Sequence, residues 1–393
     1  MPDRLTRALA VAVVVAAVGL VGFVGPTAAG AQPSVAVAGD SIADRSRIQV
    51  RHAVEPTHPI VWYETFNSAT IKKLGPPLLR EVSRPNGPDI VLVELGTGNA
   101  FWGTSPTLFR QQVRELTAGL LRHATCVRWF EQKPGGNLAY PSINRQAVAF
   151  NRILREVVNS FPRARTVHYE AWTRLAGDAV FQADLLHLNQ RGKNGLARLA
   201  AQAVTGCDPA LRTGPYWDVA DRHWAAEAVR WVADHHYIDG YANDTFRLDV
   251  GGIAPALDRL DWVQALWRRA GRPEVGPPAP WPDTPDAGAG ALAWAADAHI
   301  VGGVPGAPFR PALSVTRGDA LRWLHRAEGT PSPAPYPLHG LVDVPPGLDP
   351  VARWANGVGV LTVPDGGRLR PEDPLTRADA AVFLHRVDQP LAP

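Results

Sequence analysis

Residues 35–42 read Val-Ala-Val-Ala-Gly-Asp-Ser-Ile, an apolar run that ends in a glycine, an aspartate and a serine. Such a run is typical of a buried strand, and the Gly-Asp-Ser that follows predicts a sharp turn toward a helix. Ser41 can act as a nucleophile there if a base, and a group that orients the base, lie within hydrogen-bond reach. Gly-Asp-Ser is also a common turn and helix N-cap, so the motif alone leaves both interpretations open.

A carboxylate and an imidazole follow far downstream, in Asp184-Leu-Leu-His187. This spacing lets one short loop or helical turn direct both side chains at the same pocket, and the chain order Ser, Asp, His is compatible with an α/β scaffold. A lone Asp-x-x-His often arises by chance. Its presence together with Ser41, at the two ends of one α/β pattern, favours a serine hydrolase with Ser41, Asp184 and His187 as its triad.

Apolar, β-branched runs alternate with segments of helical periodicity between residues 34 and 204. The expected strands are Ser34–Ala38, Ile60–Tyr63, Ile90–Leu95, Cys126–Phe130 and Thr166–Tyr169. The expected helices lie near Ile71–Glu81, Pro106–Arg122, Asn144–Asn159 and Gln190–Val204. This alternation predicts a five-stranded parallel sheet covered on both faces. Active sites in such sheets lie at the carboxyl ends of strands, where Ser41 follows the first run and Asn99 the third.

The N-terminus has the parts of a secretory signal peptide. Arg4 and Arg7 precede an apolar run from Ala8 to Val24, and Ala29-Gly30-Ala31 supplies a small-x-small cleavage site. We expect cleavage after Ala31, which makes residues 1–31 the signal. The apolar run is close to the ~18 residues of a membrane span, so an uncleaved anchor is the alternative.

The chain has two cysteines, Cys126 and Cys207. An even pair in an exported protein favours one disulfide, which would tie the fourth strand to the end of the last helix of the α/β pattern. Two buried free thiols are the alternative. The sequence contains no Cys-x-x-Cys motif and no Cys/His cluster, so we predict neither a metal site nor a cofactor. A net charge of +3 over 393 residues is too small to indicate nucleic acid.

The first half of the chain resembles the SGNH, or GDSL, hydrolases over roughly residues 33–207. The regions that resemble the first, third and fifth blocks of this family are Val37–Ser41, Val91–Asn99 and Asp184–Gly192. The resemblance implies a flavodoxin-like three-layer α/β domain over residues 32–210. It also implies that the Ser41 N–H and the Asn99 side-chain amide hold the oxyanion of the tetrahedral intermediate.

The sequence departs from the family pattern in two blocks. The stretch Tyr63–Thr70 aligns with the second block but lacks the glycine whose N–H usually supplies a third donor to the oxyanion. We expect the Ser68 N–H to replace it, with Asn67 as the alternative. In the third block, Gly96-Thr97-Gly98-Asn99 has one residue more than the usual Gly-x-Asn. The alternatives are that Asn99 merely caps a helix and that the site is degenerate.

A repeat follows Cys207. Thr316-Arg317-Gly318-Asp319 and Thr376-Arg377-Ala378-Asp379 start 60 residues apart, and Asp258-Arg259-Leu260-Asp261 is a weaker copy 58 residues earlier. A nearly constant period predicts an array of helix–loop–helix units that bury their faces against one another. Aspartates and tryptophans recur near the start of each unit: Asp218, Asp283 and Asp343, then Trp231, Trp294 and Trp354.

These units resemble S-layer homology (SLH) repeats, with the first at residues 211–272, the second at 279–330 and the third at 336–390. The resemblance implies a mostly α-helical, pseudo-threefold domain that binds anionic cell-wall polysaccharide. The guanidinium groups of Arg259, Arg317 and Arg377 would then pair with acidic groups of the polymer. The alternative is that these arginines tie helix starts to neighbouring loops.

We therefore predict a secreted serine esterase that is associated with the cell wall through its SLH repeats. It would hydrolyse an O-acyl ester, on an envelope glycan or lipid, without a cofactor. One alternative is an O-acyltransferase acting on cell-wall polysaccharide, which would use the same acyl-enzyme. The other is a noncatalytic surface protein that binds glycan. We expect neither a nucleic-acid partner nor a stable membrane span after signal cleavage.

Overall fold

The structure is a computed structural model that describes residues 32–136, 141–211, 214–274, 276–302, 306–334, 338, 341–361 and 367–389. The predicted signal peptide, residues 1–31, lies outside the described residues. No helix among the residues described has both the length and the apolar character needed to span a bilayer.

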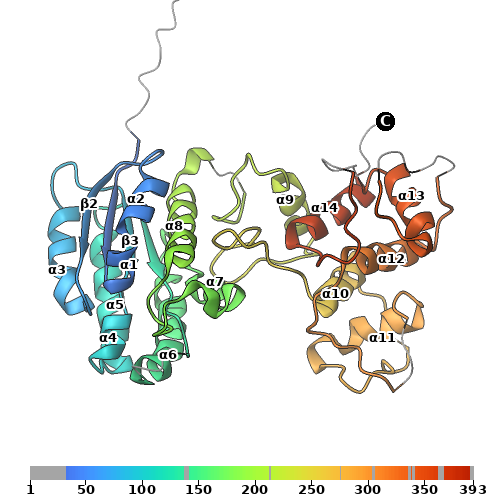
Figure 1. Ribbon diagram of the computed structural model, residues 1–393, viewed down its shortest axis with the longest axis horizontal. Coiled ribbons are helices and arrows are strands. Elements are labelled where there is room, and N and C mark those ends of the chain that lie inside the picture. The colour runs from blue at the N-terminus through green and yellow to red at the C-terminus, as the bar shows by residue number, and fades with distance from the viewer. Residues whose placement is uncertain are drawn as a thin grey trace, which may run out of the picture. The chain divides into compact units, whose positions relative to one another are not determined.

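Five parallel strands form the sheet of the first half, in the order β2-β1-β3-β4-β5 (Figure 1). Their bounds are β1 Val35–Gly39, β2 Ile60–Thr65, β3 Ile90–Glu94, β4 Cys126–Phe130 and β5 Ala164–Val167. The central strands β1, β3 and β4 are buried along their whole length, as strands covered on both faces must be. The predicted five-stranded parallel sheet is confirmed.

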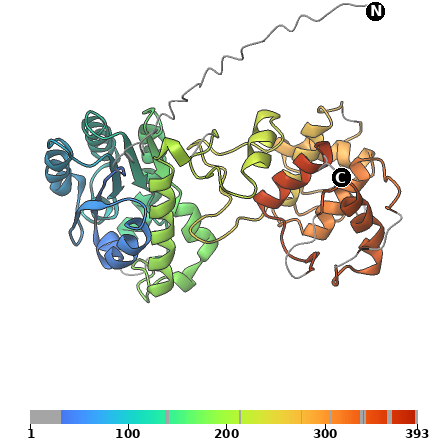
Figure 2. The ribbon, with the colours of Figure 1, turned by 90° about the horizontal axis from the view of Figure 1, so that it is seen from above.

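Helices cover both faces of this sheet (Figures 1 and 2). On one side α3 (Ile71–Val82), α5 (Pro106–Leu120) and α6 (Pro141–Val158) pack in a row, and elsewhere α2 (Arg47–Val54) packs against α8 (Gln190–Thr205). Three short helices follow strands β1, β3 and β5: α1 Ser41–Arg45, α4 Thr97–Phe101 and α7 Tyr169–Ala176. One-turn 3₁₀ segments lie at Asp178–Val180 and Pro209–Leu211.

The longer helices begin at polar caps that the sequence carries. Thr70 accepts a hydrogen bond from Lys73 N, Ser105 accepts one from Leu108 N, and the Asn189 side chain accepts one from Gly192 N.

The predicted bounds of the fifth strand were wrong, because β5 spans Ala164–Val167 and not Thr166–Tyr169. The apolar run continues past the strand end, and Tyr169 already opens α7.

Among its described residues, the second half is built from six helices joined by loops. They are α9 Ala226–Asp234, α10 Arg259–Arg269, α11 Ala289–Asp297, α12 Arg317–Ala327, α13 Asp349–Gly357 and α14 Arg377–Asp388, with 3₁₀ turns at Asp286–Gly288 and Pro346–Leu348. Three backbone hydrogen bonds form a ring, from Leu257 N to Leu375 O, from Leu375 N to Val315 O and from Val315 N to Leu257 O, at 2.8, 2.8 and 3.0 Å. The ring joins the three units in a pseudo-threefold arrangement, as predicted.

Buried apolar side chains form two clusters. The first fills the sheet half, and it also takes in Trp217 and Val250 from the range predicted as the first SLH repeat. The second holds the remaining apolar residues from Val219 to Leu384. The core of the sheet half therefore draws on side chains beyond residue 210, and the domain boundary at 210/211 stays a prediction.

A disulfide joins Cys126 at the start of β4 to Cys207 just after α8, with the two Cα atoms 5.8 Å apart. The predicted pairing is confirmed. Because the bond closes a loop of 81 residues, it restricts the unfolded chain considerably.

Candidate active site

Three chain segments meet at the carboxyl edge of the sheet. In the register of the central strands, Gly39 of β1 is level with Thr65 of β2 and Glu94 of β3. The segments that follow these three residues therefore emerge side by side. They contain Ser41, Ser68 and Asn99, which explains why residues so far apart in sequence lie near one another.

Ser41 is the first residue of α1, directly after the end of β1. Asp40 caps this helix, and its Oδ1 accepts a hydrogen bond from Ile42 N at 3.1 Å. The N–H of Ser41 has no acceptor within its helix, because it lies in the first turn. Among the residues described, no other acceptor is found for it either. This N–H is thus available beside the Ser41 hydroxyl.

A chain of hydrogen bonds links Ser41 to His187 and Asp184. Ser41 Oγ lies 3.0 Å from His187 Nε2, and His187 Nδ1 lies 2.6 Å from Asp184 Oδ2. Asp184 Oδ1 accepts the backbone N–H groups of Leu186 at 3.0 Å and His187 at 2.9 Å, which fixes the carboxylate against its own loop. The structure brings together the three residues that the sequence predicted as a triad.

The environment of Asp184 keeps its carboxylate ionised. Partial burial acts to raise the pKa of Asp184, but the hydrogen bonds from His187 and Leu186 outweigh burial and lower this pKa below its ordinary value. An ionised Asp184 accepts a hydrogen bond from the Nδ1–H group of His187. This keeps the proton of the imidazole on Nδ1 and leaves Nε2 free to accept a hydrogen bond from Ser41.

A buried carboxyl pair, Asp40 and Glu94, lies under the Ser41 turn. Glu94 Oε2 accepts from Asp40 N and Ala43 N, each at 3.3 Å, while Asp40 Oδ2 accepts from Gly98 N at 3.3 Å. Burial raises the pKa of both groups, and the charge of Asp40 raises that of Glu94 further. Burial thus favours the uncharged form of each group, and the pair binds α1 and α4 to the sheet through these hydrogen bonds.

Ser68 occupies the position expected of the missing glycine. Its φ is +52°, in the left-handed region that non-glycine residues seldom adopt. No acceptor for its N–H is found within the described part of the chain, and Ser68 lines the same cavity as Ser41 and His187. A Cβ on Gly98 would overlap the carbonyl oxygen of Ala69 and lie 2.7 Å from the carbonyl carbon of Ser68. Gly98 therefore allows the Ser68 segment to lie against α4.

The structure corrects the expectation for Asn99. Its Oδ1 accepts from Ile71 N at 3.0 Å, and its Nδ2 donates to Thr104 Oγ1 at 3.2 Å and Gln112 Oε1 at 3.1 Å. The side chain is 1% exposed and has used both amide protons, so none is left for an oxyanion. The extra residue in Gly-Thr-Gly-Asn places Asn99 inside the helix layer, where it ties α4 to α3 and α5.

Asn67 is a donor that the sequence reasoning ranked second to Ser68. Its exposed side chain lines the cavity of Ser41 and His187, and in the described chain it has no hydrogen-bond partner. Its amide remains available, unlike that of Asn99. Nothing in the sequence indicated the role of Glu94, since its partner Asp40 caps a helix more than fifty residues earlier and no local pattern pairs them.

The cavity beside Ser41 is small. Its volume is about 140 Å³, and its apolar lining comes from Phe101, Ile143 and Leu186. A short acyl group fits this space, whereas a long fatty chain would have to extend outside it.

The three arginines of the repeat signature lie against neighbouring units. Arg377 donates from Nε to Phe246 O at 2.8 Å and from Nη2 to Asp239 O at 2.7 Å, and it is 5% exposed. Arg317 donates from Nε to Leu369 O at 2.9 Å and pairs with Asp379 at 2.8 Å. Arg259 lies over the rings of Phe309 and Trp323 at 4.6 and 5.0 Å. These contacts match the alternative interpretation, in which the arginines tie helix starts to loops.

A search for metal-binding groups among the described residues finds no cluster of three or more His, Cys, Asp or Glu side chains. The aspartates that open the repeat units, Asp218, Asp283 and Asp343, instead accept backbone N–H groups. Each holds two consecutive donors of the loop that precedes the second helix, at 2.6–2.9 Å.

Comparison with known proteins bears on both halves. Residues 282–321 match the family model of the S-layer homology domain. This stretch lies within the second predicted unit, and the ring of backbone hydrogen bonds relates it to the other two. The predicted SLH character of the second half is confirmed for that unit. No curated protein matched the chain.

Three solved structures are similar in fold to the first half of the chain. LAE5, an alpha/beta hydrolase from the metagenome of Lake Arreo, Spain, is 14% identical, with a TM-score of 0.37 over 44% of this chain and 95% of its own. TesA is 18% identical, with a TM-score of 0.36 over 44% and 99%. Axe2, an acetylxylan esterase from Geobacillus stearothermophilus, is 13% identical, with a TM-score of 0.36 over 44% and 94%. These likenesses are too distant to assign an activity.

Proposed function

We propose that this protein is a serine esterase of the SGNH type that removes a small O-acyl group from an envelope glycan and works at the cell surface. The observation that carries the proposal is the hydrogen-bonded series Ser41–His187–Asp184, at 3.0 and 2.6 Å, beside a cavity of about 140 Å³. A nucleophile, a base and a group that orients the base are the parts that acyl transfer to serine needs.

In the proposed reaction, Ser41 Oγ attacks the acyl carbon while His187 Nε2 accepts the hydroxyl proton. Asp184 holds the imidazole in the required tautomer and stabilises the imidazolium. The Ser41 and Ser68 N–H groups donate to the developing oxyanion, and donors of this kind contribute about 3 kcal/mol each to the transition state. His187 then protonates the leaving alkoxide, and water attacks the acyl-enzyme in a second cycle of the same steps.

The small cavity supports a short acyl group over a fatty acyl chain. A purified chain of residues 32–393 should therefore hydrolyse p-nitrophenyl acetate faster than p-nitrophenyl palmitate, with Ser41→Ala as the inactive control. The whole mature chain is needed, because Trp217 and Val250 belong to the core of the sheet half. Equal turnover by Ser41→Ala would refute the proposal, and faster palmitate hydrolysis would refute the choice of acyl group.

We further propose that the SLH units attach the enzyme to an anionic wall polysaccharide. A groove of about 650 Å³ supports this, because Arg368, Arg370 and Arg386 line it together with the exposed ring of Trp224. Two aspartates, Asp373 and Asp379, also line it, and Asp379 is paired with Arg317. Arginine forks suit the acidic groups of such a polymer.

Attachment can be tested by sedimentation of the mature chain with purified cell walls. The double variant Arg368→Ala/Arg370→Ala should pellet less than wild type, and Arg222→Ala, an exposed arginine outside this groove, should pellet normally. Because the binding would be partly ionic, added salt should weaken it. Equal pelleting by all three proteins would contradict the proposal for this groove.

A further inference from the structure

A second arginine-rich cavity lies apart from both the Ser41 cavity and the repeat groove. Its volume is about 610 Å³, well within the range of small-ligand sites. Four arginines line it: Arg152 and Arg155 from α6, Arg174 from α7, and Arg247 from the loop that follows α9. Arg152 and Arg155 of α6 and Asn159, just after the end of that helix, follow at spacings of three and four residues, so they form a continuous row along one side of the cavity.

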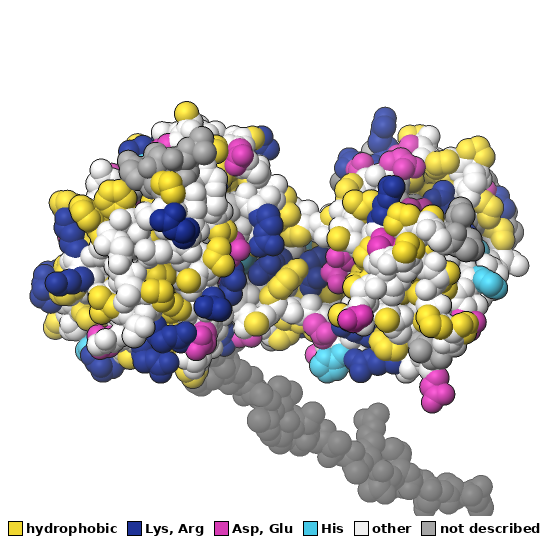
Figure 3. Space-filling model, turned by 90° about the horizontal axis from the view of Figure 1, so that it is seen from below, with side chains coloured by type: hydrophobic (Ala, Val, Ile, Leu, Met, Phe, Trp, Pro, Cys, Tyr) yellow, Lys and Arg dark blue, Asp and Glu magenta, His cyan; other side chains and the backbone are white. Residues whose placement is uncertain are grey.

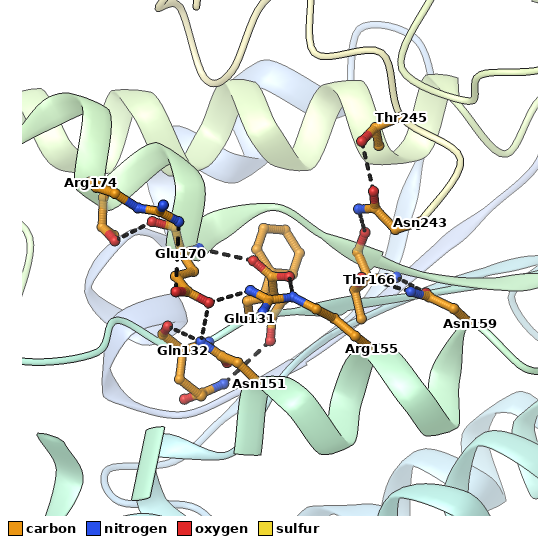
Figure 4. A network of polar contacts seen from close by, with 12 residues as sticks. Glu131, Gln132, Asn151, Arg155, Asn159, Thr166, Glu170, Arg174, Asn243 and Thr245 are labelled. Carbon is orange, nitrogen blue, oxygen red and sulfur yellow. Dashed lines mark hydrogen bonds and ion pairs between the residues drawn. The ribbon is translucent and has the colours of Figure 1, made fainter. Parts of the chain in front are cut away.

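The walls of this cavity are held in place by polar contacts (Figure 4). On one side Arg155 Nε donates to Glu131 Oε1 at 2.7 Å, and Arg155 also pairs with Glu170. On the other side Asn243 Nδ2 donates to Thr166 O at 3.0 Å, next to the β5 edge of the sheet. A site whose walls are fixed in this way loses little conformational entropy when a ligand binds.

The two carboxylates that line the cavity, Glu131 and Glu156, are each paired with an arginine. Glu156 accepts two hydrogen bonds from Arg110, at 2.6 and 2.8 Å, and Glu131 accepts from Arg155. Arg174 is 72% exposed and approaches its carboxylate, Glu170, only to 3.7 Å. Within the residues that the structure describes, Arg152 has no ion pair. The cavity is left with a positive excess, and Figure 3 shows Lys and Arg side chains gathered near the middle of one face of the molecule.

Arg247 is the least exposed of the four. Its guanidinium lies 3.6 Å above the ring of Tyr241, and its Nε is buried without a hydrogen-bond partner among the described residues. Burial lowers the pKa of this arginine. The equivalent residues of the other units, Arg310 and Arg370, follow the same kind of turn but are exposed. An enclosed guanidinium without an acceptor carries a free-energy cost that an anionic ligand would offset.

We propose that this cavity is a binding site for an anionic group, carboxylate or phosphate, carried on a glycan chain. Arg152, Arg174 and Arg247 would supply paired N–H donors for the anion, which guanidinium groups bind bidentately. Tyr241 lines the same space, and its hydroxyl can bond sugar hydroxyls, whereas the side chain of Asn159 is hydrogen-bonded to Thr166. The proposal does not depend on the esterase reaction or on the repeat groove.

Helix α6 contributes to both cavities. Ile143 lines the Ser41 cavity, and Arg152, nine residues later, lines the arginine-rich cavity. At 1.5 Å and 100° per residue, the two positions are about 14 Å apart along the helix axis and lie on opposite faces of the helix. The arginine-rich cavity is therefore a separate site from the Ser41 cavity.

Isothermal titration calorimetry on the chain of residues 32–393 tests the site with three probes. Tetragalacturonate carries carboxylates, a short glycerol phosphate oligomer carries phosphates, and xylotetraose is neutral. We expect at least one anionic probe to bind and xylotetraose not to bind. The double variant Arg152→Ala/Arg174→Ala removes two exposed side chains and should raise the Kd of that probe by about tenfold or more, since each charge-assisted contact contributes 1.5–3 kcal/mol.

Two matched variants separate this site from other arginines. Arg145→Ala removes an exposed arginine of the same helix outside the cavity, and Arg368→Ala/Arg370→Ala alters the repeat groove. Arg145→Ala should leave the Kd at this cavity unchanged, and so should Ser41→Ala, which would stop only catalysis. The groove variant should lose only binding to the repeat groove and keep the Kd at this cavity. Absence of binding by wild type, an equal loss in Arg145→Ala, or a loss confined to the groove variant would each overturn the proposal.

Discussion

The two signature motifs of this chain use their polar groups in opposite ways. In Gly39-Asp40-Ser41, the hydroxyl of Ser41 faces a cavity with His187 as its partner, and its N–H has no acceptor in the described chain. In Thr376-Arg377-Ala378-Asp379, the guanidinium of Arg377 is 5% exposed and donates to two carbonyl groups of the first unit. A sequence motif therefore predicts where a polar side chain lies in the fold. The hydrogen-bond partners of that side chain then determine whether it is available for a reaction or stabilises the fold.

The largest expected effect is on the chemical step. His187→Ala removes the base and should lower kcat on p-nitrophenyl acetate by about 10⁴-fold or more, as in serine enzymes whose triad members act as a unit. Because the residues act together, Ser41→Ala/His187→Ala should be scarcely worse than either single variant. Turnover by His187→Ala within tenfold of wild type would show that the imidazole is not the base.

Arg377→Ala should act on stability and leave the chemistry alone. It removes two charge-assisted hydrogen bonds that join the third unit to the first, each worth about 1.5–3 kcal/mol. We expect the free energy of unfolding of the repeat half to fall by about 3 kcal/mol in urea denaturation. The kcat of the folded protein should stay at the wild-type value. A variant that keeps full stability and loses only wall binding would restore the ligand role predicted for this arginine.

Gly98→Ala tests how the Ser68 N–H is positioned. The added methyl group would displace the Ser68–Ala69 backbone, which Gly98 contacts closely. Loss of one oxyanion donor should lower kcat by about 10²-fold with little change in KM. A change confined to KM would indicate that this segment binds substrate and does not stabilise the transition state.

Asn67→Ala and Asn99→Ala form a pair that separates catalysis from structure. The exposed amide of Asn67 is free, so its loss should lower kcat by up to about tenfold with no change in stability. Asn99 holds Ile71, Thr104 and Gln112, so its loss should lower the free energy of unfolding by about 2 kcal/mol. The reverse pattern, with a kcat loss only in Asn99→Ala, would reinstate the role expected from the sequence.

The smallest expected effect is on the pH dependence of stability, and it concerns the aspartates that hold equivalent turns in the three repeat units. Burial raises the pKa of Asp218 to about 6, while backbone hydrogen bonds outweigh burial and lower the pKa of Asp283 and Asp343. Between pH 6 and 5, Asp218 is protonated in the folded chain and ionised in the unfolded chain, so the folded state gains stability as the pH falls. The gain is about 1 kcal/mol over that interval.

Asp218→Asn should abolish this gain, and Asp283→Asn should keep it. The contribution of Asp283 is fully present above its unfolded pKa and is lost only at a more acidic pH. Urea denaturation of both variants at pH 6 and pH 5 measures the difference. Identical pH dependence of stability in wild type and Asp218→Asn would show that the pKa of Asp218 is not raised in the folded chain.

The sequence predicted the parts of the fold and site that depend on local patterns. Alternation of apolar runs and helical periodicity located five strands and the long helices within a few residues, and Asp184 and His187 are close enough in sequence to be recognised as a pair. Short helices such as α1 and α4 escaped, because a single turn carries no periodicity.

Contacts between distant segments were beyond the sequence. The buried pair of Asp40 and Glu94 joins the start of α1 to the end of β3, and the inward turn of Asn99 depends on one extra residue in its loop. Trp217 packs into the core of the sheet half although its motif assigns it to the repeats. Each outcome depends on which neighbour the fold supplies, and no local pattern encodes that neighbour.

The central claim is that Ser41 is the nucleophile, and labelling with a fluorophosphonate tests it most directly. This reagent forms a covalent bond with an activated serine, so one equivalent should attach to the chain of residues 32–393. Peptide mapping should place the label on Ser41, and both Ser41→Ala and His187→Ala should remain unlabelled. Labelling of Ser41→Ala to the wild-type extent, or no labelling of a folded wild-type chain, would contradict the account.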